Sequence, residues 1–176
     1  MKKKVLLVIG IIVFVILAVG SVGGDSSSSG SGSSTKKIAE VKEEEMGKVG
    51  EPFTTNNFEV TVSGIKAIDS QKINSITSLD KEDGVKYLIV DVSAKNIANE
   101  SKSLVSAGKL ILGDGDDKIE IKNDETLLTE GYGAFLEEVN PKLSKKTKLV
   151  YKIPADYADK TIIWDAFGSS KFIKLQ

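Results

Sequence analysis

The chain has 176 residues and contains no cysteine and no histidine. The lack of cysteine excludes disulfide bonds, thiolate metal sites and a lipid-modified N-terminal cysteine, and the lack of histidine removes the commonest general base. All 24 basic residues are lysine, and without arginine the bidentate contacts typical of specific nucleic-acid binding are not available. Five of those lysines and one of the 25 acids precede Ile38, so the remainder carries a net charge of about −5 and should not attract DNA or anionic lipid.

The first 22 residues combine a basic cluster with an apolar run, and they predict a segment that enters the membrane. Residues 2–4 are all lysine, and residues 5–22 are almost continuously apolar. Two interpretations fit: a signal peptide cleaved near residues 18–20, or an uncleaved anchor, which needs about 17–25 apolar residues. We favour the anchor. Because the positive-inside rule keeps the lysines in the cytosol, either interpretation exports the rest of the chain.

Residues 23–46 are predicted to connect this segment to a folded domain. Residues 23–35 read GGDSSSSGSGSST, and glycine and serine cannot bury enough apolar area to fold. Such a linker has a root-mean-square reach of about 20 Å. Residues 36–46 contain helix-forming residues with few apolar ones and predict a short charged helix. The domain is expected to begin at Gly47 and to span residues 47–176.

The longest strand pattern outside the N-terminus covers residues 85–98. Leu88, Val90, Val92 and Ala94 alternate on one face of this stretch. The opposite face is apolar at its start, with Tyr87 and Ile89, and polar at its end. Since successive side chains of a strand point to opposite faces of the sheet, we predict a central strand whose first half is covered on both sides.

Shorter strand patterns surround this central strand. They cover residues 58–62, 109–112, 118–122, 147–153, 161–167 and 171–175. Gly64 predicts a bulge, and the polar residues 69–83 predict a long loop or a short helical turn. About seven strands without a long amphipathic helix predict an all-β, immunoglobulin-like antiparallel β-sandwich. The predicted core is Phe58, Val60, Val62, Leu88, Val90, Val92, Leu110, Leu112, Ile119, Ile121, Leu149, Tyr151, Ile153, Ile162, Trp164 and Phe172.

Several short motifs, in this order, resemble a known family. They are residues 49–51 (VGE), 58–62 (FEVTV), 87–96 (YLIVDVSAKN), 113–117 (GDGDD) and 150–154 (VYKIP). The chain resembles the bacterial domain-of-unknown-function family 4352, an immunoglobulin-like sandwich found in exported Gram-positive proteins and lipoproteins. The lipobox cysteine of many relatives is replaced here by residues 19–21 (VGS), and residues 140–144 (NPKLS) depart from the usual Pro-Gly-Glu turn. The family implies no general activity that could be assigned to residues.

One acidic turn is the best metal candidate in the sequence. Asp114, Asp116 and Asp117 lie close together, and hard carboxylate oxygens suit Ca²⁺. The EF-hand pattern is absent, however, because Lys118 stands where the third ligand should be. We therefore expect an acidic hairpin tip and no resident metal or other cofactor.

The loop over residues 123–137 carries the remaining candidates. Tyr132 and Phe135 are flanked by glycines, and aromatic side chains on loops often make protein contacts, although they could instead cover an edge of the sandwich. Asp124, Glu125 and Glu130 could in principle serve a carboxylate-dependent hydrolase, but nothing in the sequence sets their separation.

These observations predict a non-enzymatic, membrane-tethered domain outside the cytoplasm that binds another protein or an envelope component. The alternatives are a structural or stress-related surface protein without a dedicated ligand, and a hydrolase that uses the loop carboxylates. The expected partners are the membrane, through the N-terminal segment, and another envelope protein, with no nucleic acid.

Overall fold

The computed structural model describes residues 42–123, 129, 131–133 and 138–176. The predicted membrane segment, the linker and most of the predicted charged helix lie outside these residues. The described end of that helix is a single 3₁₀ turn, Glu43–Glu45. Within the described ranges, no helix is long and apolar enough to cross a membrane. All described elements belong to one compact unit, residues 39–176.

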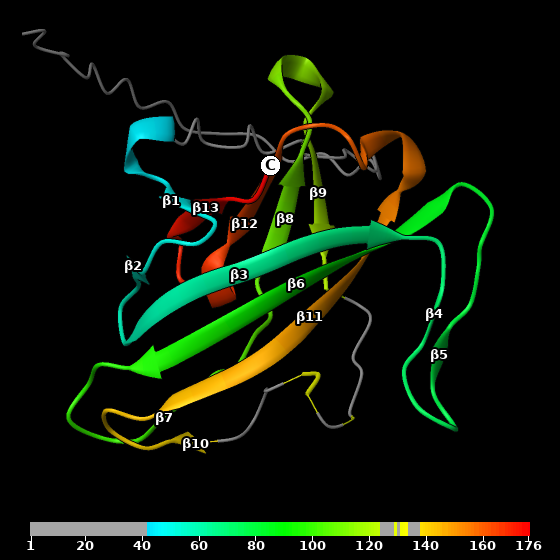
Figure 1. The fold of residues 1–176 in the computed structure, drawn as a ribbon. Helices are drawn as coiled ribbons and strands as arrows, with labels where there is room; N and C mark the ends of the chain where they lie inside the picture. The colour runs from blue at the N-terminus through cyan, green and yellow to red at the C-terminus, as the bar shows by residue number, and fades with distance from the viewer. Residues whose placement is uncertain (1–41, 124–128, 130, 134–137) are drawn as a thin grey trace, which may run out of the picture. The chain divides into compact units, whose positions relative to one another are not determined.

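Two β-sheets form the layers of this unit, and Figure 1 shows the long strands of one crossing over those of the other. The first sheet has the order β11-β6-β3-β2, and the second has the order β1-β13-β12-β8-β9. Their bounds are β1 Gly47–Lys48, β2 Phe53–Thr54, β3 Phe58–Ile68, β6 Val85–Asn96, β8 Lys109–Leu112, β9 Ile119–Lys122, β11 Ser144–Pro154, β12 Ile162–Asp165 and β13 Phe172–Lys174.

The described part of the chain contains thirteen strands, where the sequence predicted about seven, and seven of the thirteen have three residues or more. Along the chain, these seven strands are β3, β6, β8, β9, β11, β12 and β13. One sheet contains the fifth, second and first of them as neighbours (β11-β6-β3), and the other contains the seventh, sixth, third and fourth (β13-β12-β8-β9). Neighbours within each set are antiparallel. The buried side chains of both sheets join in a single main core. The predicted all-β sandwich is thereby confirmed.

The central strand behaves as its alternation predicted. Leu88, Val90 and Val92 of β6 are buried in the main core between the sheets. Tyr87 and Ile89 are buried on the opposite face, in a second, smaller cluster. The predicted bulge is also present, because the pairing of β3 with β6 shifts register at Gly64.

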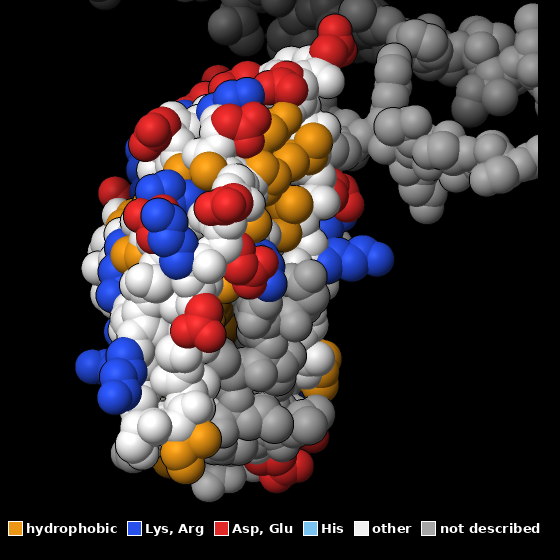
Figure 2. All heavy atoms as spheres, turned by 90° about the vertical axis from the view of Figure 1, so that its right-hand side faces the viewer, with side chains coloured by type: hydrophobic (Ala, Val, Ile, Leu, Met, Phe, Trp, Pro, Cys, Tyr) orange, Lys and Arg blue, Asp and Glu red, His pale blue; other side chains and the backbone are white. Residues whose placement is uncertain are grey.

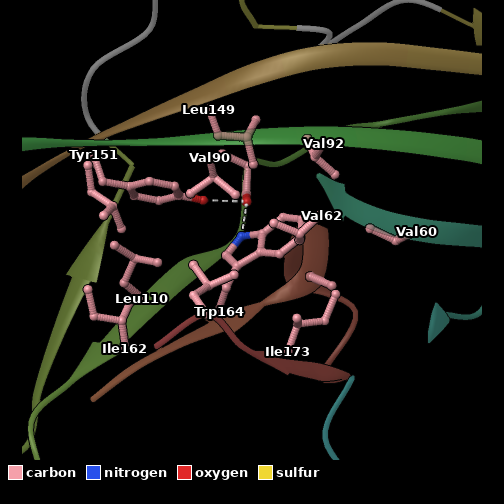
Figure 3. Packing of buried hydrophobic residues seen from close by; sticks show 14 of the residues in the cluster. Val60, Val62, Val90, Val92, Leu110, Leu149, Tyr151, Ile162, Trp164 and Ile173 are labelled. Carbon is pink, nitrogen blue, oxygen red and sulfur yellow. Dashed lines mark hydrogen bonds between the residues drawn. The ribbon is translucent and has the colours of Figure 1, made fainter. Parts of the chain in front are cut away.

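The main core is centred on Trp164, which is fully buried. Its Nε1–H donates a hydrogen bond of 2.8 Å to the carbonyl oxygen of Ala107, and the Tyr151 hydroxyl donates one of 2.7 Å to the same oxygen (Figure 3). Phe167 packs edge-on against the Trp164 ring, with ring centroids 5.0 Å apart. Two rings with polar ends can be buried here because each donor has found a partner.

Three residues that were predicted to be in the core are only partly buried. Ile119 and Ile121 are only partly buried, because β9 is an edge strand of its sheet. Phe172 is also partly buried and does not belong to the core cluster. In β13 the fully buried residue is Ile173, which lies opposite Trp164 in the register. The face of β13 that points into the core is therefore the opposite of the predicted one. A difference of one residue is enough for this, because successive side chains of a strand point to opposite faces.

The prediction of a loop or helical turn over residues 69–83 is wrong, because this stretch contains a hairpin of β4 (Gln71–Lys72) and β5 (Ser78–Leu79). The tip is closed by Asn74, whose side-chain oxygen accepts hydrogen bonds of 2.8 Å from the backbone N–H groups of Ile76 and Thr77. Asparagine commonly closes turns in this way.

Figure 2 faces the side of the domain from which this hairpin projects. Hydrophobic side chains gather in its upper part among acidic and lysine side chains, and the described lower part is mostly uncharged. A further two-stranded sheet, β7 (Lys102–Ser103) with β10 (Glu138–Val139), completes the described strands.

Candidate functional site

The outer face of the sheet β11-β6-β3 is divided into a covered half and an open half. In the covered half, Leu79 of the β4–β5 hairpin packs against Tyr87, Ile89 and Val150. Three partly buried residues also pack there: Ile68, Ile73 and Tyr132. The sheet thus has apolar packing on both faces at this end, and polar side chains remain at the other.

The open half carries a groove of about 330 Å³. It crosses three neighbouring strands, and we call it the polar groove. Its polar side chains are those of Thr61, Ser63, Asp91, Ser93, Lys146 and Lys148.

Strand register arranges these side chains in rows across the sheet. Ser93 of β6 lies opposite Thr61 of β3 on one side and opposite Lys146 of β11 on the other. In the next row, Asp91 of β6 lies opposite Lys148 of β11. Neighbouring strands are about 4.8 Å apart, so each row brings side chains from distant parts of the sequence into contact range.

The two rows differ in whether their polar side chains form hydrogen bonds or ion pairs. Asp91 and Lys148 form an ion pair, and the Ser63 hydroxyl donates a hydrogen bond of 3.3 Å to the Asp91 carbonyl oxygen. The row of Thr61, Ser93 and Lys146 is different: within the described residues, none of these three side chains has a hydrogen-bond or ion-pair partner. Two hydroxyls and one ammonium therefore face the groove without a protein partner among the described residues.

Tyr132, a predicted contact residue, lies beside the groove and packs into the covered half. Its side chain is half-buried, and its hydroxyl accepts a hydrogen bond of 3.3 Å from the Gln71 side chain. Residues 131–133 lie beside β11, where the Lys148 N–H donates a hydrogen bond of 2.9 Å to the Gly131 carbonyl oxygen. Tyr132 thus covers an edge of the sandwich, which was the structural alternative for it. The other predicted contact residue, Phe135, lies outside the described residues.

In the acidic turn, Asp117 is bound by other side chains of the protein. Asp117 accepts a hydrogen bond of 2.8 Å from the Tyr157 hydroxyl and pairs with Lys160, which holds the pKa of Asp117 below its ordinary value. Asp114 and Asp116 are exposed. No group of three acidic side chains that could hold a metal ion occurs in the part of the chain that the structure describes. The hydrolase candidates Asp124, Glu125 and Glu130 lie outside it.

Asn96, which ends the family motif in the central strand, is also structural. It is fully buried, and its side-chain amide donates hydrogen bonds of 2.8 Å to the Glu100 carbonyl and 2.7 Å to the Val139 carbonyl. Its side-chain oxygen accepts one of 2.9 Å from the Ala98 N–H. A single asparagine here closes the corner between β6 and the strands that follow, so it is not available to a ligand.

Asp165 is a buried carboxylate at the end of β12, and its replacement by asparagine should have a defined pH dependence. Burial raises the pKa of Asp165, while its Oδ1 accepts a hydrogen bond of 2.9 Å from the Ser170 N–H. An acid whose pKa is higher in the folded state destabilises the fold above that pKa and has no effect below its unfolded pKa. Asp165→Asn keeps the acceptor and removes the charge. We expect it to be at least as stable as the wild type in urea at pH 7, with the difference disappearing by about pH 3. A variant that is less stable at pH 7 would contradict this.

The fold and the groove together define an all-β sandwich domain with an open polar surface on one sheet. The family model described as "Domain of unknown function (DUF4352)" matches residues 47–172, so the chain belongs to this family, as its motifs predicted. A search of curated proteins found no significant match.

Solved structures of similar fold include three bacterial proteins. A conserved hypothetical protein from Bacillus anthracis is 20% identical with a TM-score of 0.56, over 73% of this chain and 94% of the other. An uncharacterized beta-sandwich protein from Clostridium difficile is 16% identical with a TM-score of 0.53, over 79% and 100%. The yjhA protein from Bacillus subtilis is 18% identical with a TM-score of 0.50, over 74% and 100%. At these identities the likeness concerns the fold alone.

The groove was not identified from the sequence. The polar end of the central strand's outer face, with Asp91 and Ser93, was the available signal. Which residues of β3 and β11 lie beside it depends on register, and the bulge at Gly64 changes that register within β3.

Proposed function

We propose that the chain is a non-enzymatic binding module outside the cytoplasm, held at the membrane by its N-terminal segment, that binds a component of the cell envelope in the polar groove. The observation that carries this proposal is the row of Thr61, Ser93 and Lys146. Polar groups that face a cavity without partners in the described structure are available to a ligand.

The tether is supported by the order of segments along the chain. Three lysines, an apolar run of about the length of a membrane span and a glycine- and serine-rich linker precede the domain. Such a linker would hold the domain within about 20 Å of the bilayer, which suits binding to a component of the envelope.

The immunoglobulin-like description is supported by strand order. An immunoglobulin sandwich of seven strands, A to G, groups A, B, E and D in one sheet and C, F and G in the other. Here the first, second and fifth long strands share one sheet, and the third, sixth and seventh share the other, so only the fourth strand, which lies beside the third, departs from this grouping. Domains of this architecture commonly serve as binding modules at cell surfaces.

The non-enzymatic part of the proposal is supported by composition and by charge at the groove. The chain contains neither cysteine nor histidine, which supply many nucleophiles and general bases. The groove's carboxylate, Asp91, is already paired with Lys148.

A sedimentation experiment with isolated Gram-positive cell walls tests this proposal. Full-length protein in detergent should co-sediment with the walls, and Ser93→Trp, which fills the groove, should lose most of that binding. Ser75→Trp adds the same ring to an exposed site on the β4–β5 hairpin and should bind like the wild type. Failure of the wild type to sediment, or equal binding by Ser93→Trp, would refute the proposal.

A further inference from the structure

We propose that the polar groove binds a phosphodiester group of a linear polyanion, with Thr61, Ser93 and Lys146 as its hydrogen-bond donors. This inference rests on the proposed function and adds the chemical class of the ligand. It follows from the geometry of one row of side chains, from the charge of the rows beside it and from the kind of hydrogen-bonding groups present.

The geometry places three donors where one ligand group can reach them. Ser93 lies between Thr61 and Lys146 on adjacent strands, so the two hydroxyls are carried by backbones about 5 Å apart. The lysine stem is long and flexible, and it can bring its ammonium over the neighbouring Ser93. Thr61 and Ser93 are half-buried at the floor of the groove, and Lys146 is exposed at its edge.

The charges beside this row are already compensated. On one side Asp91 pairs with Lys148, and on the other Glu59 lies 3.9 Å from Lys95. Lys146 therefore contributes one positive charge that no acid balances within the described residues. A diester phosphate carries one negative charge and can pair with this ammonium, which a neutral sugar cannot. The net charge of about −5 on the domain disfavours a polyanion at long range, so the attraction must be local to Lys146 and the contacts within the groove.

The donor set also favours an oxyanion. An ammonium can only donate hydrogen bonds, and a hydroxyl can donate one to an anionic oxygen. A metal ion would need oxygen ligands without a cation among them, and Lys146 excludes that. Hydrogen bonds to charged oxygens are about twice as strong as neutral ones, which allows three exposed or half-buried groups to hold such a ligand. Repeated phosphodiesters along a polymer would raise the apparent affinity further, because rebinding is intramolecular.

Binding of a synthetic oligo(glycerol phosphate) to the full-length chain in detergent tests this inference. The wild type should bind, with affinity that falls as salt rises. Lys146→Gln should weaken binding roughly tenfold or more, since it removes a charged hydrogen bond. Ser93→Ala should weaken it by a smaller factor. Lys171→Gln removes an equally exposed lysine from the loop before β13 and should leave the affinity unchanged.

Each other outcome contradicts one part of the proposal. An equal loss in Lys171→Gln would mean that overall charge, rather than the groove, controls binding. Equal binding of an oligogalacturonate of the same length would replace the phosphodiester by any anionic polymer. If the probe does not bind although Ser93→Trp abolishes binding to cell walls, the ligand class is wrong and the binding function stands. Thermal unfolding of each variant shows whether a loss of binding reflects a loss of fold.

Discussion

Replacing Gly108 with alanine is expected to destabilise the domain by about 2–5 kcal/mol, as the sum of a backbone and a packing penalty. Gly108 has a φ of +79°, which side chains with a Cβ rarely adopt. A Cβ at this position would lie 1.9 Å from the carbonyl oxygen of Asp165 and 3.0 Å from Nε1 of Trp164. Neither atom can move freely, because one belongs to the backbone of β12 and the other is hydrogen-bonded to Ala107. Chemical denaturation of the purified variant measures the effect.

Gly84→Ala separates the two penalties. Gly84 has a φ of +73°, close to that of Gly108, and a Cβ there would have no heavy atom within 4 Å. This variant should lose only the backbone term, about 1–2 kcal/mol. If the two variants are destabilised equally, the close approach of β12 to Gly108 does not contribute, and the packing described around Trp164 would be wrong.

Replacing Val92 with aspartate is expected to cost about 3–5 kcal/mol, the usual penalty for a buried charge without a partner. Val92 is 3% exposed and lies in the main core (Figure 3). An aspartate there must either remain charged in an apolar environment or take up a proton, and both cost free energy. Urea unfolding at pH 7 should show the loss. Acidic pH should reduce it, because the protonated side chain is less costly to bury.

Ser93→Asp is the matched control for this prediction. Ser93 is the next residue of the same strand, and it faces the polar groove rather than the core. Because aspartate is unfavourable within a strand, we expect Ser93→Asp to cost up to about 1 kcal/mol, well below the cost of Val92→Asp. A large loss in Ser93→Asp, or a small one in Val92→Asp, would contradict the assignment of the two faces of β6.

Local sequence patterns determined much of the fold. Alternation along residues 85–98 identified the central strand and its double covering, because strand periodicity is a property of the backbone and needs no partner. Gly64 identified the bulge for the same local reason, and the order of short motifs identified the family. The glycine- and aspartate-rich turn before Ile119 identified the hairpin of β8 and β9.

The tertiary structure decided what the local patterns left open. The sequence 69–83 is polar, and it forms a hairpin because Leu79 and Ile73 can bury against Tyr87 and Ile89 of a strand that follows later in the chain. Ile173 replaced Phe172 in the core because the pairing of β13 with β12 places it opposite Trp164. Neither outcome can be read from a short window, since both depend on which side chain of another strand lies opposite.

The candidate site depends on tertiary structure most of all. Thr61, Ser93 and Lys146 are more than thirty residues apart in the chain, and each alone resembles an ordinary surface residue of a strand. Sequence alone determined that the domain is an all-β sandwich without cysteine or histidine chemistry. Only the register of three strands, including the shift at Gly64, decided that two hydroxyls and one ammonium share a groove, because register is determined by contacts between strands and not by any strand itself.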